Sequence, residues 1–219
     1  MDIVEINANF DSDYQLKQLI SRKDIFLLGT IHRLKEAQDI LKDFLLLTNP
    51  AVITVEISPY SLSWRRKREK LWLNKFEETL IQEKLPLTPA LESLKMALAM
   101  PYEYKIARDL NIAPVIPIDL NKPAKKYLKE LESALNPENL KKLATMPLSP
   151  QKEKALARLF LKKLYQPSIN FYDRKREAYM AQKIKILAKR RPLVHIGGWR
   201  HLAGLSSYFK DAFTGIILP

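Results

Sequence analysis

The 219-residue chain has no cysteine, only five glycines and only three histidines. The absence of cysteine excludes disulfides, thiolate metal sites and a cysteine nucleophile. No apolar run approaches the roughly 18 residues of a membrane span, and residues 1–5 lack the basic flank and apolar stretch of a signal peptide. We therefore expect a cytoplasmic protein.

Several common catalytic and binding motifs are also missing. The sequence contains neither H-E-x-x-H nor G-x-S-x-G, which argues against a zincin and an α/β-hydrolase. It has no Walker or G-x-G-x-x-G pattern, so a phosphate-binding loop at the glycine pair 197–198 is unsupported.

Charge is unevenly balanced, with 37 basic and 24 acidic side chains and a net charge of +13. Such an excess fits either a nucleic-acid partner or a lysine-rich solvated surface. The basic residues lie between apolar residues at helical spacing, as in ordinary amphipathic helices. A nucleic-acid partner is therefore possible but not favoured, and the oligomeric state is open.

Short apolar segments that alternate with helical patterns predict an α/β fold with a mainly parallel central sheet and flanking helices. The whole chain, 1–219, is expected to form one domain. Two prolines in the segment 114–118 favour an edge strand there. The expected strands are 3–6, 25–28, 52–55, 114–118, 193–196 and 214–218.

A long helical block follows the fourth of these strands. Residues 122–191 show no strand signal, and prolines divide them into about four helices. This block is longer than one crossover needs. We expect residues 122–169 to form a helical cap that overhangs the functional site.

Two units of the chain share the pattern strand, G-x-x-H, helix. The segment Ile25–His32 is a short apolar run that leads to Gly29 and then His32, and Leu193–His201 contains Gly198 and His201 in the same relation. We expect Gly29 to allow a sharp turn at the end of its strand. Both histidines would then lie at strand carboxyl ends, where open α/β sheets bind ligands.

Acidic and basic residues occupy corresponding positions. Glu56 and Asp119 follow two further strands. Glu103 lies in the first turn of a helix that feeds a strand, and so does a group that contains Asp173, Arg174, Arg176 and Glu177. Because this topology places strand carboxyl ends and these helix starts at one edge, all of them are expected to meet.

Two histidines with a carboxylate are typical ligands of a divalent metal such as Zn, Mn, Co or Fe. We predict that His32, His201 and Glu56 bind the metal, with general-base catalysis as the other role for Glu56. We assign supporting catalytic roles to Asp119, Arg176 and Glu103. We expect Gly29 and Gly198 to lie close to the cofactor.

Each of these residues also has a purely structural interpretation. A histidine can cap a turn, a carboxylate can form an ion pair or complement a helix dipole, and an arginine can be surface charge. His195 lies inside an apolar strand, so we interpret it as a core residue, with a third-ligand role as the alternative.

These motifs, in this order, resemble the TraB/Tiki family within the wider EreA/ChaN-like group. The resemblance rests on Leu27–His32, Ile53–Ile57, Ile118-Asp119, Arg176–Ala181 and Gly198–Gly204. The chain departs from the family pattern at Lys175 and Arg200, which stand where an acidic and a small residue are usual.

The resemblance implies a metal-dependent hydrolase, with protease activity in the Tiki branch and ester cleavage in the EreA-like branch. It also implies that both G-x-x-H histidines and the first glutamate are functional. The expected substrate is a peptide or a small molecule. A haem- or metal-binding protein without catalysis is the alternative, and haem is the less favoured cofactor.

Overall fold

The computed structural model describes residues 3–32, 34, 36–147 and 150–219. Two predictions reach beyond these ranges. The interpretation of the N-terminus includes residues 1–2, and the predicted cap includes residues 148–149; both pairs lie outside the described residues.

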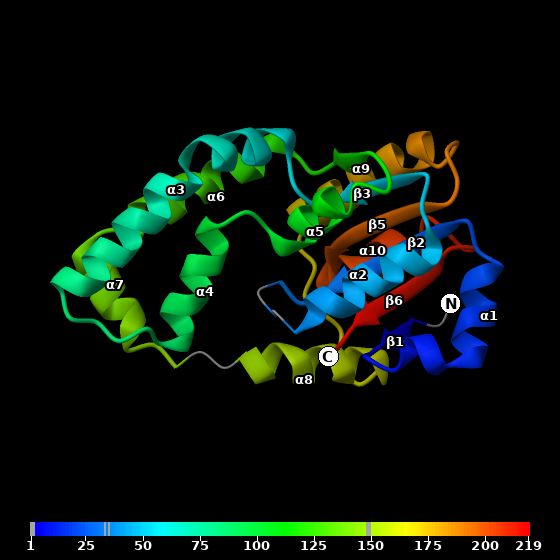
Figure 1. Cartoon of the computed structure of the whole chain (residues 1–219), viewed down its shortest axis with the longest axis horizontal. Coiled ribbons are helices and arrows are strands. Elements are labelled where there is room, and N and C mark those ends of the chain that lie inside the picture. Colours follow the sequence, from blue (N-terminus) through cyan, green and yellow to red (C-terminus); the bar gives the residue numbers. More distant parts are fainter. Residues whose placement is uncertain (1–2, 33, 35, 148–149) are drawn as a thin grey trace.

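A six-stranded, all-parallel sheet forms the centre of the fold, in the order β1-β6-β2-β5-β3-β4 (Figure 1). This confirms the predicted α/β class. The short first strand and the proline-containing fourth strand are the two edges, as the proline pattern predicted for the latter. The strands are β1 (Val4–Ile6), β2 (Ile25–Thr30), β3 (Val52–Val55), β4 (Val115–Pro117), β5 (Leu193–Gly198) and β6 (Phe213–Ile217).

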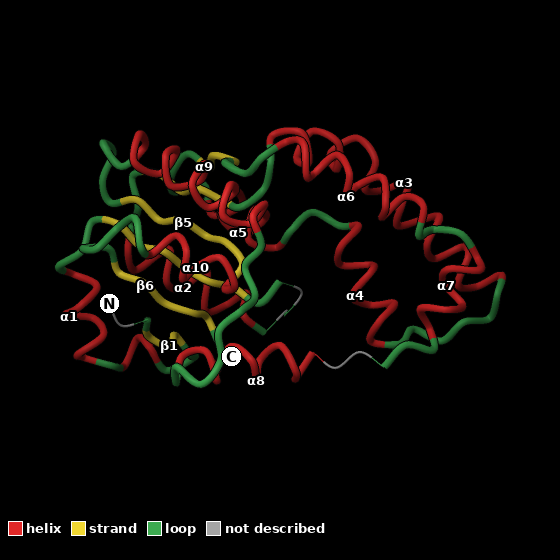
Figure 2. The backbone as a smooth tube through the Cα atoms, turned by 180° about the vertical axis from the view of Figure 1, so that it is seen from behind, coloured by secondary structure: helices red, strands yellow, loops and turns green. Residues whose placement is uncertain are grey.

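Helices cover both faces of the sheet (Figures 1 and 2). One face carries a short 3₁₀ turn, η1 (Phe10–Ser12), with α1 (Tyr14–Ser21), α2 (Ala37–Thr48) and α5 (Tyr102–Leu110). The other carries α8 (Pro150–Leu161), α9 (Phe171–Leu187) and α10 (Trp199–Ser206). Because both faces are buried, the central strands are apolar almost throughout, and every residue of β3, β5 and β6 is buried.

Four further helices form a lobe with its own apolar core, which we call the helical lobe. It consists of α3 (Pro59–Gln82), α4 (Pro89–Leu98), α6 (Asn121–Ser133) and α7 (Pro137–Ala144). Trp72, Phe76, Leu91 and Leu128 lie in its core. Figures 1 and 2 show the lobe extending away from the sheet.

The predicted cap is therefore divided between two places. Its α6 and α7 join α3 and α4 in the helical lobe, whereas α8 packs on the sheet domain, where Phe160 lies 5.6 Å from Trp199 between ring centroids. The physical reason is that α3 and α4 offer the apolar surface that α6 and α7 bury, which the local pattern could not reveal. That the block contacts substrate stays a prediction.

The helical lobe begins beside the carboxyl edge of the sheet. Helices α3 and α6 directly follow β3 and β4, and Asn121 Oδ1 accepts a hydrogen bond of 3.0 Å from the backbone N–H of Tyr60. The buried guanidinium of Arg65 donates to the carbonyls of Leu98 and Ala99 at the end of α4. These bonds connect α3 to α6 and to the end of α4 within the lobe.

The prediction of a sharp turn at Gly29 is wrong. Strand β2 continues through Gly29 and Thr30, and Gly29 is paired with Gly197 of β5. A Cβ on Gly29 would lie 2.9 Å from Cα of Trp199, so the glycine permits close packing of α10 on the sheet. His201 likewise lies inside the first turn of α10, and not before the helix as expected.

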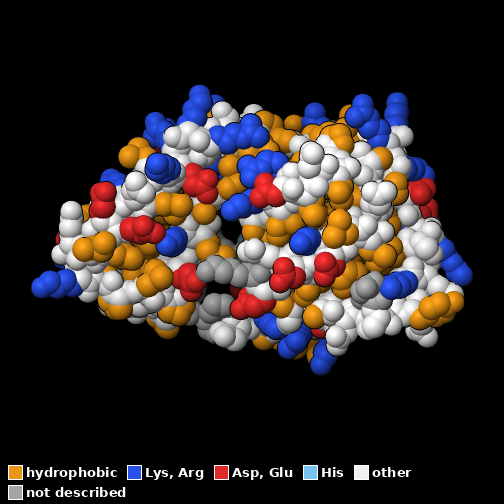
Figure 3. All heavy atoms as spheres, viewed as in Figure 1, with side chains coloured by type: hydrophobic (Ala, Val, Ile, Leu, Met, Phe, Trp, Pro, Cys, Tyr) orange, Lys and Arg blue, Asp and Glu red, His pale blue; other side chains and the backbone are white. Residues whose placement is uncertain are grey.

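Charged side chains are spread over the molecule. On the face in Figure 3, Lys and Arg side chains are distributed widely and are interspersed with Asp and Glu. None of the described helices combines the length and apolar composition that crossing a bilayer would require.

Candidate functional site

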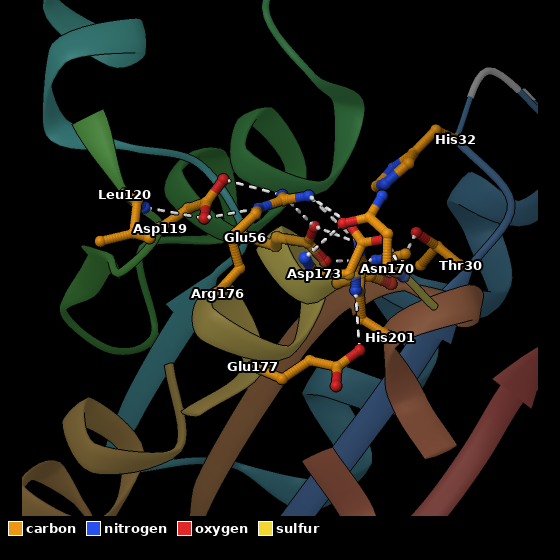
Figure 4. Close-up of polar contacts among 12 residues, drawn as sticks. Thr30, His32, Glu56, Asp119, Leu120, Asn170, Asp173, Arg176, Glu177 and His201 are labelled. Carbon is orange, nitrogen blue, oxygen red and sulfur yellow. Dashed lines mark hydrogen bonds and ion pairs between the residues drawn. The ribbon is translucent and has the colours of Figure 1, made fainter. Parts of the chain in front are cut away.

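Polar side chains from six elements meet at the carboxyl edge of the sheet (Figure 4). His32 and Asp119 follow β2 and β4, and Glu56 directly follows β3. Helices α5, α9 and α10 begin at this edge and supply the rest in their first two turns. These are Glu103 of α5, Arg176 and Glu177 of α9, and His201 of α10.

A buried glutamate holds His32. Nδ1 of His32 lies 2.7 Å from Oε1 of Glu103, and Thr30 Oγ1 donates to the same oxygen at 2.8 Å. The glutamate side chain is 3% exposed, whereas the histidine side chain is 51% exposed. Burial alone would raise the pKa of Glu103, but His32 and the hydrogen bonds outweigh it and lower the pKa. Glu103 is therefore an ionised anchor for a more accessible imidazole.

A second buried glutamate holds His201 in the same manner. Nδ1 of His201 lies 3.0 Å from Oε1 of Glu177. A Cβ on Gly204 would overlap this carboxylate, so the glycine makes room for it. Burial raises the pKa of Glu177, although His201 acts in the opposite direction. In both histidines a carboxylate accepts the hydrogen bond of Nδ1–H, which leaves the lone pair on Nε2.

Glu56 lies between the two histidine pairs. Its side chain is 5% exposed, and its Oε2 accepts a 2.8 Å hydrogen bond from the backbone N–H of Gly198. Nε2 of His201 lies 3.6 Å from Oε1. On the other side of the site, a Cβ on Gly198 would lie 2.7 Å from Nε2 of His32. The glycine thus lets His32 and Glu56 approach the same backbone position.

The charge state of Glu56 follows from these neighbours. Burial alone would raise its pKa, but the neighbouring His201 and Arg176 act in the opposite direction and outweigh burial, so the pKa of Glu56 is lowered. The carboxylate is therefore ionised at neutral pH and can accept a proton or bind a cation.

Arg176 connects the acidic residues of the site. Nε and Nη2 bind the two carboxylate oxygens of Asp119 at 3.1 and 2.9 Å, and Nη2 also donates to Oε1 of Glu56 at 2.7 Å. Nη1 lies 3.2 Å from Nε2 of His201. Burial alone would lower the pKa of Arg176, but its carboxylate partners raise this pKa by more than burial lowers it. The guanidinium is therefore permanently charged.

His195 belongs to both the core and the site. It is fully buried on β5, and its Nδ1 lies 3.1 Å from Thr54 Oγ1. Its Nε2 has no hydrogen-bond partner among the described residues. A Cβ on Gly197 would meet both this nitrogen, at 3.0 Å, and Oε2 of Glu56, at 2.6 Å. Burial lowers the pKa of His195 to about 4, so a neutral imidazole lies beneath Glu56.

The structure thus brings together most of the residues that the sequence singled out. Gly29 is one exception, because it packs against α10. Arg174 is another, because none of the contacts that form the described site involves its side chain. Sequence reasoning placed Glu177 near the site without assigning it as the partner of His201, for which its position one residue after Arg176 was the available signal. Gly204 ended the Gly198–Gly204 motif and Thr30 lay within Leu27–His32, but neither received a role.

Carboxylates dominate the charge of the site. The described part of the site contains five carboxylates, three of which form ion pairs with the guanidinium of Arg176, in a protein whose net charge is +13. With neutral imidazoles, such a cluster attracts cations. The carboxylates are Glu56, Glu103, Asp119, Asp173 and Glu177.

The residue types at this edge are those that bind divalent cations, but the described side chains are not arranged as a metal site. Among the described residues, no three His, Cys, Asp or Glu side chains are already arranged to hold a metal. One obstacle is that Nη1 of Arg176 lies against the lone pair of His201 Nε2. The two imidazoles, oriented through Nδ1, and the ionised Glu56 are nevertheless suitable ligands, and the absent side chains of Gly197 and Gly198 leave space beside them.

Comparison of the chain with protein-family models, with curated proteins and with solved structures gave no match.

Proposed function

We propose that this protein is a metal-dependent hydrolase that cleaves amide or ester bonds at the carboxyl edge of its sheet. The observation that carries the proposal is the pair of histidines on two different strand–helix units, each held at Nδ1 by a buried glutamate. Carboxylate–histidine pairs of this kind orient imidazoles that bind metals through Nε2.

His32, His201 and Glu56 would hold the cation. They supply two neutral nitrogens and one negative oxygen, the ligand set of many catalytic sites with open positions. When bound, the cation would polarise a substrate carbonyl and lower the pKa of water. The surplus of carboxylates favours a divalent cation over an anion at this place.

The remaining residues have distinct parts. Glu56 is either a ligand or the general base that accepts a proton from water, since its carboxylate is ionised and buried. Arg176, oriented by Asp119, would stabilise negative charge that develops on a substrate oxygen. Glu103 and Glu177 position the two histidines and do not contact the substrate.

The resemblance to the TraB/Tiki family agrees with this proposal, because both of its G-x-x-H histidines and its first glutamate correspond to residues of this site. The group includes proteases, esterases and haem-binding proteins, so the resemblance leaves the substrate open.

Metal analysis tests the proposal most directly. The protein is purified without chelators and without a metal-affinity tag, and its metal content is measured beside the His32→Ala/His201→Ala double variant. Glu153→Gln is the control, because Glu153 forms an exposed ion pair with Arg200. We expect about one divalent ion per chain in the wild type and the control, and little in the double variant.

A panel of peptides and small esters then tests hydrolysis. Equal metal content in the wild type and the double variant would contradict the metal site. Retained metal with no cleavage of any panel member would instead support a metal-binding protein without catalysis. A Soret band in the purified protein would identify a haem carrier.

A further inference from the structure

One guanidinium nitrogen occupies the place where a metal–ligand bond would form. Nη1 of Arg176 lies 3.2 Å from Nε2 of His201, and the Nδ1 of that ring faces Glu177. A guanidinium has only donors, so the imidazole nitrogen accepts this contact through its single lone pair. Because a metal needs the same lone pair, the contact with Arg176 and a bond to a metal exclude each other.

The guanidinium can leave this lone pair while it keeps its main anchor. Asp119 binds Nε and Nη2, whereas Nη1 alone contacts His201. Asp173, one turn earlier on α9, has its Oδ1 3.9 Å from Nη1. A small rotation would therefore transfer Nη1 from the histidine to Asp173 without breaking the paired bonds to Asp119.

The guanidinium also compensates charge that a metal would compensate. Nη2 donates to Glu56 at 2.7 Å, and the Glu56 side chain is 5% exposed. A buried carboxylate without a partner is costly, so a cation at this position stabilises the protein when no metal is bound.

We infer that Arg176 is an internal competitor for the metal: its guanidinium holds the metal position in the metal-free protein and moves toward Asp173 when a divalent cation binds. The inference rests on the proposed function, because it assigns His201 and Glu56 to the same cation. The observed metal affinity would then depend on how much more tightly the site binds the metal than it binds the guanidinium. Arg176 would also have a positioning role before the substrate binds.

Substitutions that separate charge from geometry test the inference. Zn²⁺ binding is measured by calorimetry for the wild type, Arg176→Gln, Arg176→Lys and Arg200→Gln. Lysine keeps the positive charge but cannot bind Asp119, Glu56 and His201 simultaneously. Because removal of a competing state raises the apparent affinity, we expect Zn²⁺ affinity to rise about tenfold or more in both Arg176 variants. Arg200 forms an exposed pair with Glu153, so Arg200→Gln controls for the loss of a nearby arginine and should bind as the wild type does.

Each result has a defined meaning. An increase in Arg176→Gln with none in Arg176→Lys would show that charge alone matters and would overturn the inference. Equal affinity in the wild type and both Arg176 variants would overturn it while leaving the metal site intact. Absence of Zn²⁺ binding in every protein would contradict the proposed function and the inference together.

A measurement on the wild type avoids any dependence on the folding of the variants. Nitrogen-15 spectra of the Arg176 side chain and of the His201 ring are recorded during a Zn²⁺ titration. We expect the Nη signals of Arg176 and the Nε2 signal of His201 to shift over the same range of Zn²⁺ concentration. Arg176 signals that stay unchanged when His201 is saturated would overturn the inference.

Discussion

Oε1 of Glu103 lies 2.7 Å from Nδ1 of His32, although the two residues are 71 positions apart in the sequence. The glutamate is buried and the imidazole is half exposed. This contact fixes the orientation of the ring and directs Nε2 toward Gly198, beside Glu56.

Glu103→Gln should weaken metal binding while the fold is retained. The amide keeps the shape of the side chain but loses the charge that orients His32, and loss of such a partner typically costs about 10–100-fold in metal affinity. The measurement is a Zn²⁺ titration with Glu77→Gln as control, since Glu77 pairs with Lys95 on the surface. Unchanged affinity in Glu103→Gln would show that His32 is not a ligand.

Glu56→Gln distinguishes the two roles of this residue. If Glu56 is the general base, turnover should fall by about 10²–10⁴-fold while the metal stays bound. If it is a ligand, metal occupancy should fall first, and excess metal should partly restore activity. Both quantities are measured on the same preparation, with a substrate from the peptide and ester panel. Full activity at normal metal content would remove Glu56 from the mechanism.

Gly29→Ala and Gly198→Ala should have different effects, although both glycines begin a G-x-x-H unit. At position 29 the added Cβ would meet Cα of Trp199 at 2.9 Å, so the variant should lose about 1–3 kcal/mol of unfolding free energy. At position 198 the Cβ would lie 2.7 Å from Nε2 of His32, so metal affinity should fall more than stability. Urea denaturation and Zn²⁺ titration of both variants test this. A loss of metal affinity in Gly29→Ala as large as in Gly198→Ala would be inconsistent with the packing role of Gly29.

His195 should make the protein less stable as the pH falls from 6.5 to about 4. Its pKa in the folded protein is about 4, below the ordinary 6.5, because burial disfavours the charged ring. Between these pH values, His195 is protonated in the unfolded chain but stays neutral in the native protein. The stability contribution is therefore complete above pH 6.5 and is lost on acidification, by at most about 1.4 kcal/mol per pH unit.

The His195→Gln substitution removes the titration of this ring. The difference in unfolding free energy between the wild type and the variant therefore separates the effect of His195 from that of nearby carboxylates. The lowered pKa values of Glu56 and Glu103 add losses of stability as the pH falls below their ordinary value of 4.5, and the raised pKa of Glu177 acts in the opposite direction. Unfolding free energies at pH 6.5, 5.5 and 4.5 are compared for the two proteins. Parallel pH profiles would mean that His195 is accessible to protons in the native state.

Local sequence patterns were sufficient to predict much of this architecture. Short β-branched and apolar runs that alternate with amphipathic stretches specify buried parallel strands, and the structure confirms the α/β class. Because strand direction fixes which edge each strand end reaches, the sequence also placed Glu56, Asp119 and the two G-x-x-H histidines at one edge.

Tertiary structure decided what those residues contact. The sequence could not show that α6 and α7 pack with α3 and α4, because this packing depends on apolar surfaces that are distant in the chain. Nor could it show that Gly29 makes room for Trp199, or that Glu103 and Glu177 each orient a histidine. Hydrogen-bond partners separated by tens of residues are selected by how the helices dock on the sheet, and the pairing of Arg176 with His201 exists only in that packed arrangement.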